Sequence, residues 1–359
     1  MENRIIGLLI GCAYGDAMGM PSEMMSRRTL KKAFPNGVHE FLSSTPYDFI
    51  GRKFKAGSVT DDTINTLLVC DSIIDNKGKF DVKKYIHSLQ VWIKNNGDKN
   101  PYIMGPSTLK ALTAISNGTS MEKSGLFGTT NGSAMKVSPL GIICDYQDLD
   151  YLVNTVKLLC MPTHNTNIAI TGASIVASLA SFVLRGNKDI QKMWKLAFTV
   201  IDACKDWVND LPSASLVARL LHVQNLLETK SQQEVLYDLE TLYGTGMETI
   251  ETIPTVMALL ELSHLEPHMC AELSANLSGD TDTIGSIATS ICGAANNTFT
   301  KEEIEFLEKT NQINFTEYAN KLVQYLRWFR FFENNTIYYK LTRIIKAVYT
   351  VKIVTLSFY

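Results

Sequence analysis

Two short acidic turns carry the residues of this 359-residue chain that are best suited to hold metal ions. Residues 60–63 read Thr-Asp-Asp-Thr and residues 280–283 read Asp-Thr-Asp-Thr, without histidine or cysteine. Their four aspartates carry about as much negative charge as two divalent cations carry positive charge. Oxygen donors alone favour Mg²⁺, Mn²⁺ or Ca²⁺ over Zn²⁺, which prefers nitrogen and sulfur. Together the turns predict a site for two metal ions, with Mg²⁺ the first expectation and Mn²⁺ the second.

Each acidic turn opens an apolar run of helical character, at residues 64–74 and 284–295. We therefore expect the carboxylates at helix N-termini, where free backbone amides stabilise negative charge. For either turn alone another interpretation stays open, because aspartate and threonine are also ordinary N-cap residues.

Most of the chain has the apolar spacing of amphipathic helices. These runs are residues 81–94, 189–208, 216–227, 231–242, 254–263 and 302–310. Residues 168–184 and 284–295 are apolar on every face and rich in small residues, which is typical of helices buried inside a bundle. We predict an all-α fold: residues 1–328 form a compact single-domain orthogonal helical bundle with a binuclear metal cleft. Residues 329–359, with a strand-like stretch at 347–356, form a C-terminal extension of unknown role.

The composition narrows the class of protein. With 45% hydrophobic and 19% charged residues, the chain can bury a sizeable core. Its net charge of -2, without a long run of like charge, argues against general nucleic-acid binding and against an anionic membrane surface. Its seven cysteines are scattered and include no Cys-x-x-Cys pair, which is typical of reduced thiols in a cytoplasmic protein.

Two segments imitate targeting signals. Residues 9–12 have the look of a lipoprotein cleavage box, but the apolar stretch before them is short. Residues 168–184 reach the lower limit of a membrane span, yet their threonine, glycine and serine content favours a closely packed central helix. We therefore expect no membrane partner.

Two polar loops are candidates for ligand contacts. Residues 95–101 are the best candidate for a mobile lid. Residues 125–132 read Gly-Leu-Phe-Gly-Thr-Thr-Asn-Gly, and successive backbone amides in such a loop can hold a diphosphate without a Walker lysine. Most loops of this composition are only turns, so the residues alone leave both interpretations open.

Five motifs follow one another in a known order. They are residues 7–23 (GLLIGCAYGDAMGMPSE), 57–63 (GSVTDDT), 131–136 (NGSAMK), 163–164 (TH) and 279–285 (GDTDTIG). In this order they closely resemble the ADP-ribosylglycohydrolase family, over roughly residues 5–325. The resemblance implies a compact all-helical domain with a binuclear Mg²⁺ or Mn²⁺ centre in a cleft that binds ADP-ribose.

The resemblance also implies roles for individual residues. The implied metal ligands are Thr60, Asp61, Asp62, Asp280, Asp282 and Thr283. The implied diphosphate loop is Gly128, Thr129, Thr130, Asn131, Gly132 and Ser133. Glu23 would lie beside the metals, and either Glu23 or Asp62 would orient the attacking water or take its proton. His164 would lie near the ribose and phosphates, with a core histidine as the alternative, and Asp16 would fix the local turn.

The implied activity is metal-dependent hydrolysis of the glycosidic bond between ADP-ribose and a modified acceptor, which reverses mono-ADP-ribosylation. The reaction passes through an oxocarbenium-like state and needs an activated water, and a metal pair suits both needs. The partner would be an ADP-ribosylated protein or a small-molecule conjugate. Arginine, serine and other acceptors stay open.

Three departures from the family pattern stand out. Lys136 replaces a common arginine, the usual Pro and Trp are missing after Ala295, and residues 329–359 lie beyond the familiar core. None of these changes removes an implied ligand.

Three rival interpretations are weaker. A haloacid dehalogenase-type phosphatase would need a buried strand before residue 280, and residues 274–279 are no such strand. A zinc site at His264 and His268 is disfavoured because Pro267 interrupts the helix that would align them. A non-catalytic ADP-ribose-binding or crystallin-like member of the fold is the alternative function, and lost ligands would be its sign.

Overall fold

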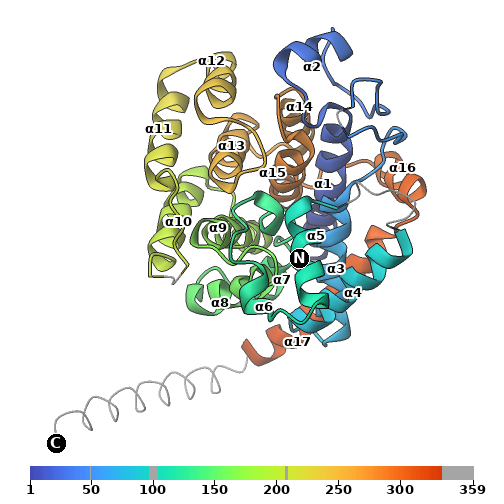
Figure 1. Cartoon of the computed structure of the whole chain (residues 1–359), viewed down its shortest axis with the longest axis vertical. Coiled ribbons are helices and arrows are strands. Elements are labelled where there is room, and N and C mark those ends of the chain that lie inside the picture. Colours follow the sequence, from blue (N-terminus) through green and yellow to red (C-terminus); the bar gives the residue numbers. More distant parts are fainter. Residues whose placement is uncertain (49, 97–103, 207–208, 334–359) are drawn as a thin grey trace, which may run out of the picture.

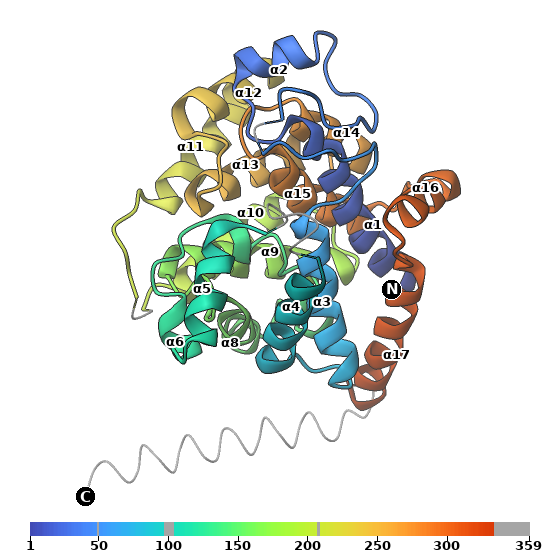
Figure 2. The same cartoon turned by 45° about the vertical axis from the view of Figure 1, so that its right-hand side comes forward.

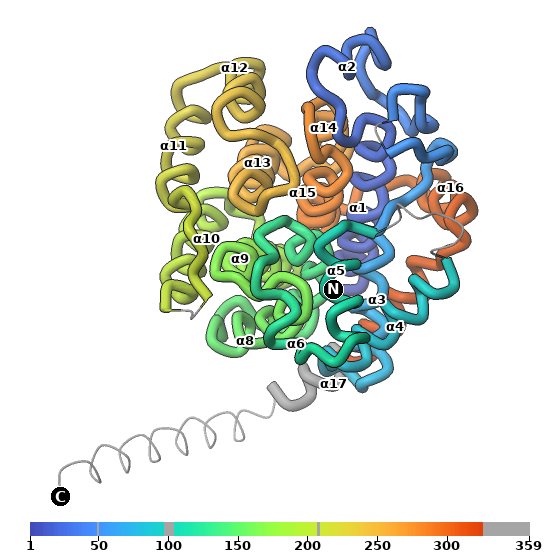
Figure 3. The backbone as a smooth tube through the Cα atoms, in the orientation of Figure 1, coloured from blue at the N-terminus to red at the C-terminus, as the bar shows by residue number. Residues whose placement is uncertain are grey.

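The computed structural model describes residues 1–48, 50–96, 104–206 and 209–333 (Figures 1 and 3). Over these ranges the chain forms helices joined by loops, and its β contacts are two isolated bridges, Met25 with Gly279 and Thr130 with Glu248. The prediction of an all-α fold is therefore confirmed.

The first half of the chain contains α1 (Glu2–Gly19), η1 (Met20–Ser22), α2 (Arg27–Ala33), α3 (Asp61–Asp75), α4 (Val82–Asn96), α5 (Pro106–Ser116), α6 (Met121–Ser124), η2 (Asn131–Ser133), α7 (Leu140–Ile143), α8 (Leu149–Cys160) and α9 (Asn167–Leu184). The second half contains α10 (Ile190–Ala203), α11 (Leu216–Thr229), α12 (Gln232–Asp238), η3 (Leu239–Tyr243), α13 (Thr249–Leu262), α14 (Pro267–Ala275), α15 (Thr281–Ala295), α16 (Lys301–Asn311) and α17 (Phe315–Glu333). Figure 2 shows α16 and α17 along the outer side of α1.

Helices α1 and α15 lie in backbone contact in the middle of the fold (Figure 1). α1 carries a glycine at every fourth position, 7, 11, 15 and 19. A Cβ atom at Gly7 would lie 2.0 Å from the carbonyl oxygen of Gly293, and one at Gly19 would lie 2.4 Å from the backbone nitrogen of Asp282. Only glycine permits such an approach. The contact therefore sets the C-terminal end of α1 against the N-terminal end of α15, where the second acidic turn lies.

Helices α1 and α9 supply much of the apolar interior. By length and composition alone both could cross a membrane, and 89% and 94% of their apolar windows are buried inside the protein. α9 contacts α7, α8, α10, α13 and α15. Burial against other helices accounts for the composition of residues 168–184, as expected of a central helix.

Several helix ends differ from the expected ones. The expected helix 189–208 ends at Ala203, and the expected helix 231–242 is divided into α12 and the π-helical turn η3. Helix α13 begins at Thr249 rather than at Pro254, which lies inside it. A proline removes the hydrogen bond to the carbonyl four residues earlier. Here that carbonyl, of Ile250, accepts a hydrogen bond from Arg219 Nη1 at 3.0 Å, so the helix tolerates the proline.

Other expectations concern thiols and the chain end. All seven cysteines are buried and free, in agreement with reduced thiols. The expected lid at 95–101 lies largely outside the described residues, because α4 ends at Asn96 and residues 97–103 are not described. Helix α17 runs through the expected domain boundary at 328/329, and the strand-like stretch 347–356 also lies outside the described residues. The division into domain and extension stays a prediction.

Candidate active site

The first acidic turn is held by α1. Thr60 is the N-cap of α3, and its hydroxyl accepts a hydrogen bond from the Asp62 amide at 3.3 Å. Asp16, buried in α1, accepts from the Thr60 amide at 2.9 Å, the Thr63 amide at 3.1 Å and the Thr63 hydroxyl at 2.6 Å. Asp16 therefore fixes this turn, as the motif indicates.

The second acidic turn is held by the segment that carries Glu23. The amide of Met24 donates to the carbonyl of Gly279 at 2.6 Å, and the amide of Gly279 donates to the carbonyl of Met25 at 3.0 Å. The amide of Asp280 donates to the carbonyl of Thr245 at 2.7 Å. These short backbone contacts bring Glu23 and Asp280, far apart in sequence, to one place.

The two turns meet through the side chain of Asp62. Its Oδ2 atom accepts hydrogen bonds from the Thr60 hydroxyl at 3.1 Å and from the Thr283 hydroxyl at 3.2 Å. Carboxylate oxygens of Glu23, Asp280 and Asp282 lie within 4.8 Å of one another. The implied ligands on the two turns thus come together around one site, together with Glu23.

This site holds more negative charge than the described protein groups neutralise. Burial, and then repulsion by Asp282, hold the pKa values of Glu23, Asp62 and Asp280 well above their usual range. Arg52 supplies one positive charge, with Nη1 at 2.5 Å from Glu23 Oε2. The other Asp62 oxygen, Oδ1, is buried without a hydrogen-bond donor among the described residues. Such crowded oxygen donors fit divalent cations.

A pocket opens beside the carboxylates. It is lined by Glu23, Asp61, Asp62, Gly105, Pro106, Ser107, Thr108, Thr130, Asn131, Gly132, Met135, His164, Met247, Asp280 and Thr283. Asn131 connects the glycine-containing loop to the second turn, because its Nδ2 atom donates to Asp280 Oδ2 at 2.6 Å. Carboxylates and loop therefore share one cavity.

The loop residues differ in what they offer to a ligand. Thr130, Asn131 and Gly132 line the pocket, whereas Gly128, Thr129 and Ser133 are not among its lining residues. The Ser133 hydroxyl donates to the carbonyl of Ala169 at 3.2 Å in the core. The amides of Gly128 and Asn131 donate to the carbonyls of Gly125 and Met247. These two amides already have partners inside the protein, so a diphosphate would need others.

His164 lines the pocket and is also fully bonded within the fold. Its Nε2 atom lies 2.9 Å from the Thr130 hydroxyl, and its Nδ1 atom lies 2.8 Å from the Thr163 hydroxyl. Burial, and then the charge of Lys136, lower the pKa of His164 to about 3. The imidazole is therefore neutral, and it contacts the loop rather than the carboxylates.

Sequence reasoning missed two contributions to the site. Arg52 belongs to a loop without regular periodicity, so no local pattern identified it as the partner of Glu23. The N-terminus of α5 also faces the site, because the Gly105 amide donates to Asp61 Oδ2 at 3.2 Å. The Gly105-Pro106 pair is a typical helix start and could have suggested an anion-facing end.

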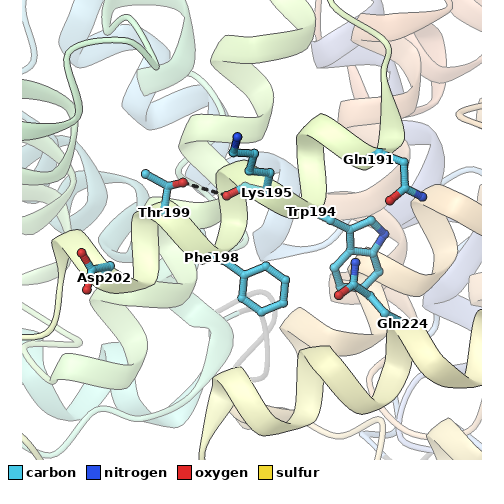
Figure 4. A pocket seen from close by; sticks show the side chains of 7 residues that line it. All are labelled: Gln191, Trp194, Lys195, Phe198, Thr199, Asp202 and Gln224. Carbon is cyan, nitrogen blue, oxygen red and sulfur yellow. Dashed lines mark hydrogen bonds between the residues drawn. The ribbon is translucent and has the colours of Figure 1, made fainter.

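A second hollow, between α10 and α11, contrasts with this site (Figure 4). Its lining residues are Gln191, Trp194, Lys195, Phe198, Thr199, Asp202 and Gln224. It is the larger of the two, about 530 Å³ against about 90 Å³, and the more open to solvent. Asp202 is its only lining carboxylate, so it offers no cluster of metal ligands.

His264 and His268 form no zinc site either. The Nδ1 and Nε2 atoms of His268 each lie 3.0 Å from a glutamate oxygen, on Glu266 and Glu303.

Comparison with known proteins now decides the family. The ADP-ribosylglycohydrolase family model matches residues 1–325. This chain belongs to the ADP-ribosylglycohydrolase family. It is 36% identical over 328 residues to the uncharacterized protein YegU of Escherichia coli, covering 90% of this chain and 97% of the relative. It is 25% identical over 321 residues to the ADP-ribosylhydrolase ARH3 of Homo sapiens, covering 81% and 85%.

A solved structure has the same fold. The chain matches a structure titled ADP-ribosylglycohydrolase-related protein complex with a TM-score of 0.66 and 20% identity, over 90% of this chain and 98% of that one. Family membership identifies the protein as a hydrolase of the glycosidase class, as the motifs predicted. The five motifs therefore have a common explanation in one enzyme family.

Proposed function

We propose that this enzyme removes ADP-ribose from a modified acceptor and depends on two divalent cations, Mg²⁺ in the first place and Mn²⁺ in the second. The observation that carries the proposal is the meeting of both acidic turns at Asp62, next to a pocket that also contains the glycine-containing loop. The proposed substrate is an ADP-ribosylated protein or a small-molecule conjugate, in the cytoplasm.

The donor set supports the cations. Thr60, Asp61 and Asp62 would hold them from α3, and Asp280, Asp282 and Thr283 would hold them from α15. When bound, the cations supply Lewis acidity to the water and the ribose hydroxyls. They would also offset the repulsion that, after burial itself, raises the pKa values of Asp62 and Asp280.

The carboxylates that flank the site would handle the proton. Asp62 Oδ1 has no donor among the described residues and is free to accept a hydrogen bond from the attacking water. Glu23, held by Arg52, is the second candidate to orient this water or accept its proton. As the glycosidic bond breaks, positive charge develops on the ribose, and the surrounding aspartates stabilise it.

The test is release of free ADP-ribose from arginine-linked and serine-linked peptides, with Mg²⁺, with Mn²⁺ and with EDTA. We expect release that depends on the metal and is absent in Asp282→Asn. The ratio between the two peptides would identify the acceptor. Release that persists undiminished in EDTA would contradict the cation dependence. If no conjugate is cleaved although ADP-ribose raises the melting temperature, the proposed reaction is wrong and the protein is a binder.

A further inference from the structure

A chain of hydrogen bonds leads from a buried lysine to the wall of the pocket. Lys136 Nζ lies 3.4 Å from the Thr163 hydroxyl, and this hydroxyl lies 2.8 Å from Nδ1 of His164. The other ring nitrogen, Nε2, lies 2.9 Å from the hydroxyl of Thr130. Lys136, Thr163 and His164 are all at least 98% buried, and the chain ends at the pocket, which His164 and Thr130 line.

One assignment of donors and acceptors leads along this chain from Lys136 to the pocket. The ammonium of Lys136 can only donate, so the Thr163 oxygen accepts from it and keeps its own hydrogen to give. His164 is neutral, so one ring nitrogen accepts and the other donates. If Nδ1 accepts from Thr163, the ring proton lies on Nε2 and is donated to Thr130. The hydroxyl hydrogen of Thr130 is then left for an acceptor inside the pocket.

We propose that Lys136 is a positioning residue: through Thr163 it fixes the Nε2-protonated tautomer of His164, so that Thr130 presents a hydrogen-bond donor to an anionic oxygen of the ligand. The chemical class of that ligand group is a phosphate ester, because its oxygens accept hydrogen bonds strongly and the pocket belongs to a glycosidase of ADP-ribosyl compounds. Assignment of the group to the diphosphate of ADP-ribose rests on the proposed function.

The surroundings of Lys136 decide which variants can test this role. Its Nζ lies 5.4 Å from the centre of the Tyr85 ring. The Tyr85 hydroxyl donates to Asn65 at 2.9 Å, and Asn65 donates to the carbonyl of Asp61 at 2.8 Å. The Lys136 ammonium therefore also lies against a residue that supports the first acidic turn. Lys136→Met keeps the length of the side chain and removes both this contact and the donor, whereas Thr163→Val removes the hydroxyl and leaves the lysine unchanged.

The experiment has two readouts. The tautomer of His164 is read from its ring ¹³C and ¹⁵N chemical shifts in the ligand-free protein, with His164→Gln to assign the signals. The Kd for ADP-ribose is measured by calorimetry. In the wild type we expect the Nε2-protonated form. In Lys136→Met and in Thr163→Val we expect a mixture of tautomers and about tenfold weaker binding, the loss of about one hydrogen bond.

Further variants separate this role from simple packing. The double variant should bind ADP-ribose about as weakly as each single variant, because both remove the same interaction. Lys136→Arg, which keeps a donor, should restore the tautomer. Thr155→Val is the matched control, because Thr155 is also buried, its hydroxyl donates to the carbonyl of Tyr151 in its own helix at 2.8 Å, and it is not among the residues that line the pocket. It should change neither readout.

Clear results would overturn the proposal. These are an Nδ1-protonated His164 in the wild type, an unchanged tautomer and Kd in folded Lys136→Met and Thr163→Val, or additive losses in the double variant. If Lys136→Met fails to fold, Thr163→Val decides alone. The tautomer is read without ligand. A protein that cleaves no conjugate would therefore contradict the proposed function, and the ring chemical shifts of His164 would still test this inference.

Discussion

At the scale of single residues, the site depends on carboxylates that repel one another. Asp62 and Asp280 are buried and Glu23 lies partly buried beside them, and burial, followed by repulsion from Asp282, raises the pKa values of all three. Without a bound metal ion such a cluster lowers the stability of the fold. The ionised carboxylates are removed from water, and the positively charged side chains of the described residues do not balance them. Stability and activity should therefore respond in opposite directions when one charge is removed.

Asp61→Asn and Asp282→Asn test that opposition. We expect each to abolish turnover, and the metal-free melting temperature to stay the same or rise, because one repulsive charge is lost. Turnover and thermal unfolding in EDTA are the measurements. Asp202→Asn is the control, because Asp202 is an exposed carboxylate outside the site. Full turnover in either site variant would contradict the ligand assignment.

Glu23 should act on the reaction more than on binding. Removal of a group that accepts or positions a proton typically lowers the rate about 10²–10⁴-fold. We therefore expect Glu23→Gln to lower kcat by at least about 100-fold and to leave the Kd for ADP-ribose nearly unchanged. Turnover and calorimetry make the comparison. An unchanged kcat would reduce Glu23 to a structural partner of Arg52.

At the scale of elements, the contact between α1 and α15 determines where the second turn lies. A side chain at Gly7 would meet the backbone of Gly293, several turns away from the carboxylates, whereas one at Gly19 would meet Asp282. A side chain at either position would clash with the backbone of α15, but only position 19 lies beside an acidic residue of the candidate active site.

Gly7→Ala and Gly19→Ala form a matched pair. Overpacking of this kind costs about 1–3 kcal/mol, so both variants should unfold more easily in urea. Only Gly19→Ala should also lose most of its turnover, because the added methyl would displace Asp282. Equal turnover in the two variants would show that the close approach serves stability alone.

Helices α14 and α16 are connected by a histidine–glutamate contact whose strength depends on pH. His268, in α14, contacts Glu266 and Glu303, the latter in α16. Burial lowers the pKa of His268, but its bonds to the two glutamates outweigh burial and the net shift is upward. The stabilisation is therefore complete below the unfolded pKa of histidine, about 6.5, and is lost as the pH rises through the higher folded value.

His268→Asn should remove this pH dependence. Near pH 6 the free energy of unfolding of the variant should be lower than that of the wild type by less than about 1 kcal/mol, because the contact is partly exposed. Near pH 9 the two proteins should be nearly equally stable. Urea unfolding at both pH values measures the difference. A difference that is the same at both pH values would contradict a charged His268.

At the scale of the whole molecule, the cations should join parts of the chain that are distant in sequence. We expect Mg²⁺ to bind the folded state through α3 and α15 and to stabilise the protein by about 2.7 kcal/mol at a hundredfold excess over its Kd. Thermal unfolding with Mg²⁺, Mn²⁺ and EDTA measures the effect. No shift with either metal, or an equal shift in Asp282→Asn, would contradict the metal site.

Local pattern explains what could be read from the sequence. The acidic turns, the buried run at 168–184 and the loop before Asn131 have signals within a few residues, and the structure brings the turns and part of the loop together. Contacts such as Arg52 with Glu23, or Thr245 with Asp280, join segments without any shared local signal, so they needed the fold. The glycine spacing of α1 was visible, but its meaning appeared only with the partner helix.

The pairing of α1 with α15 also has a consequence for biosynthesis. Helix α1 leaves the ribosome long before α15, and its glycine face finds its partner only after more than 260 further residues have been made. Until then the apolar surface of α1 that packs against α15 is exposed. The contact between α1 and α15 also closes a long loop of chain, which slows folding and favours aggregation. We expect nascent chains that stop before α15 to be captured by chaperones and to lack Mg²⁺ binding, so that this enzyme acquires its chemistry only once α15 has been made.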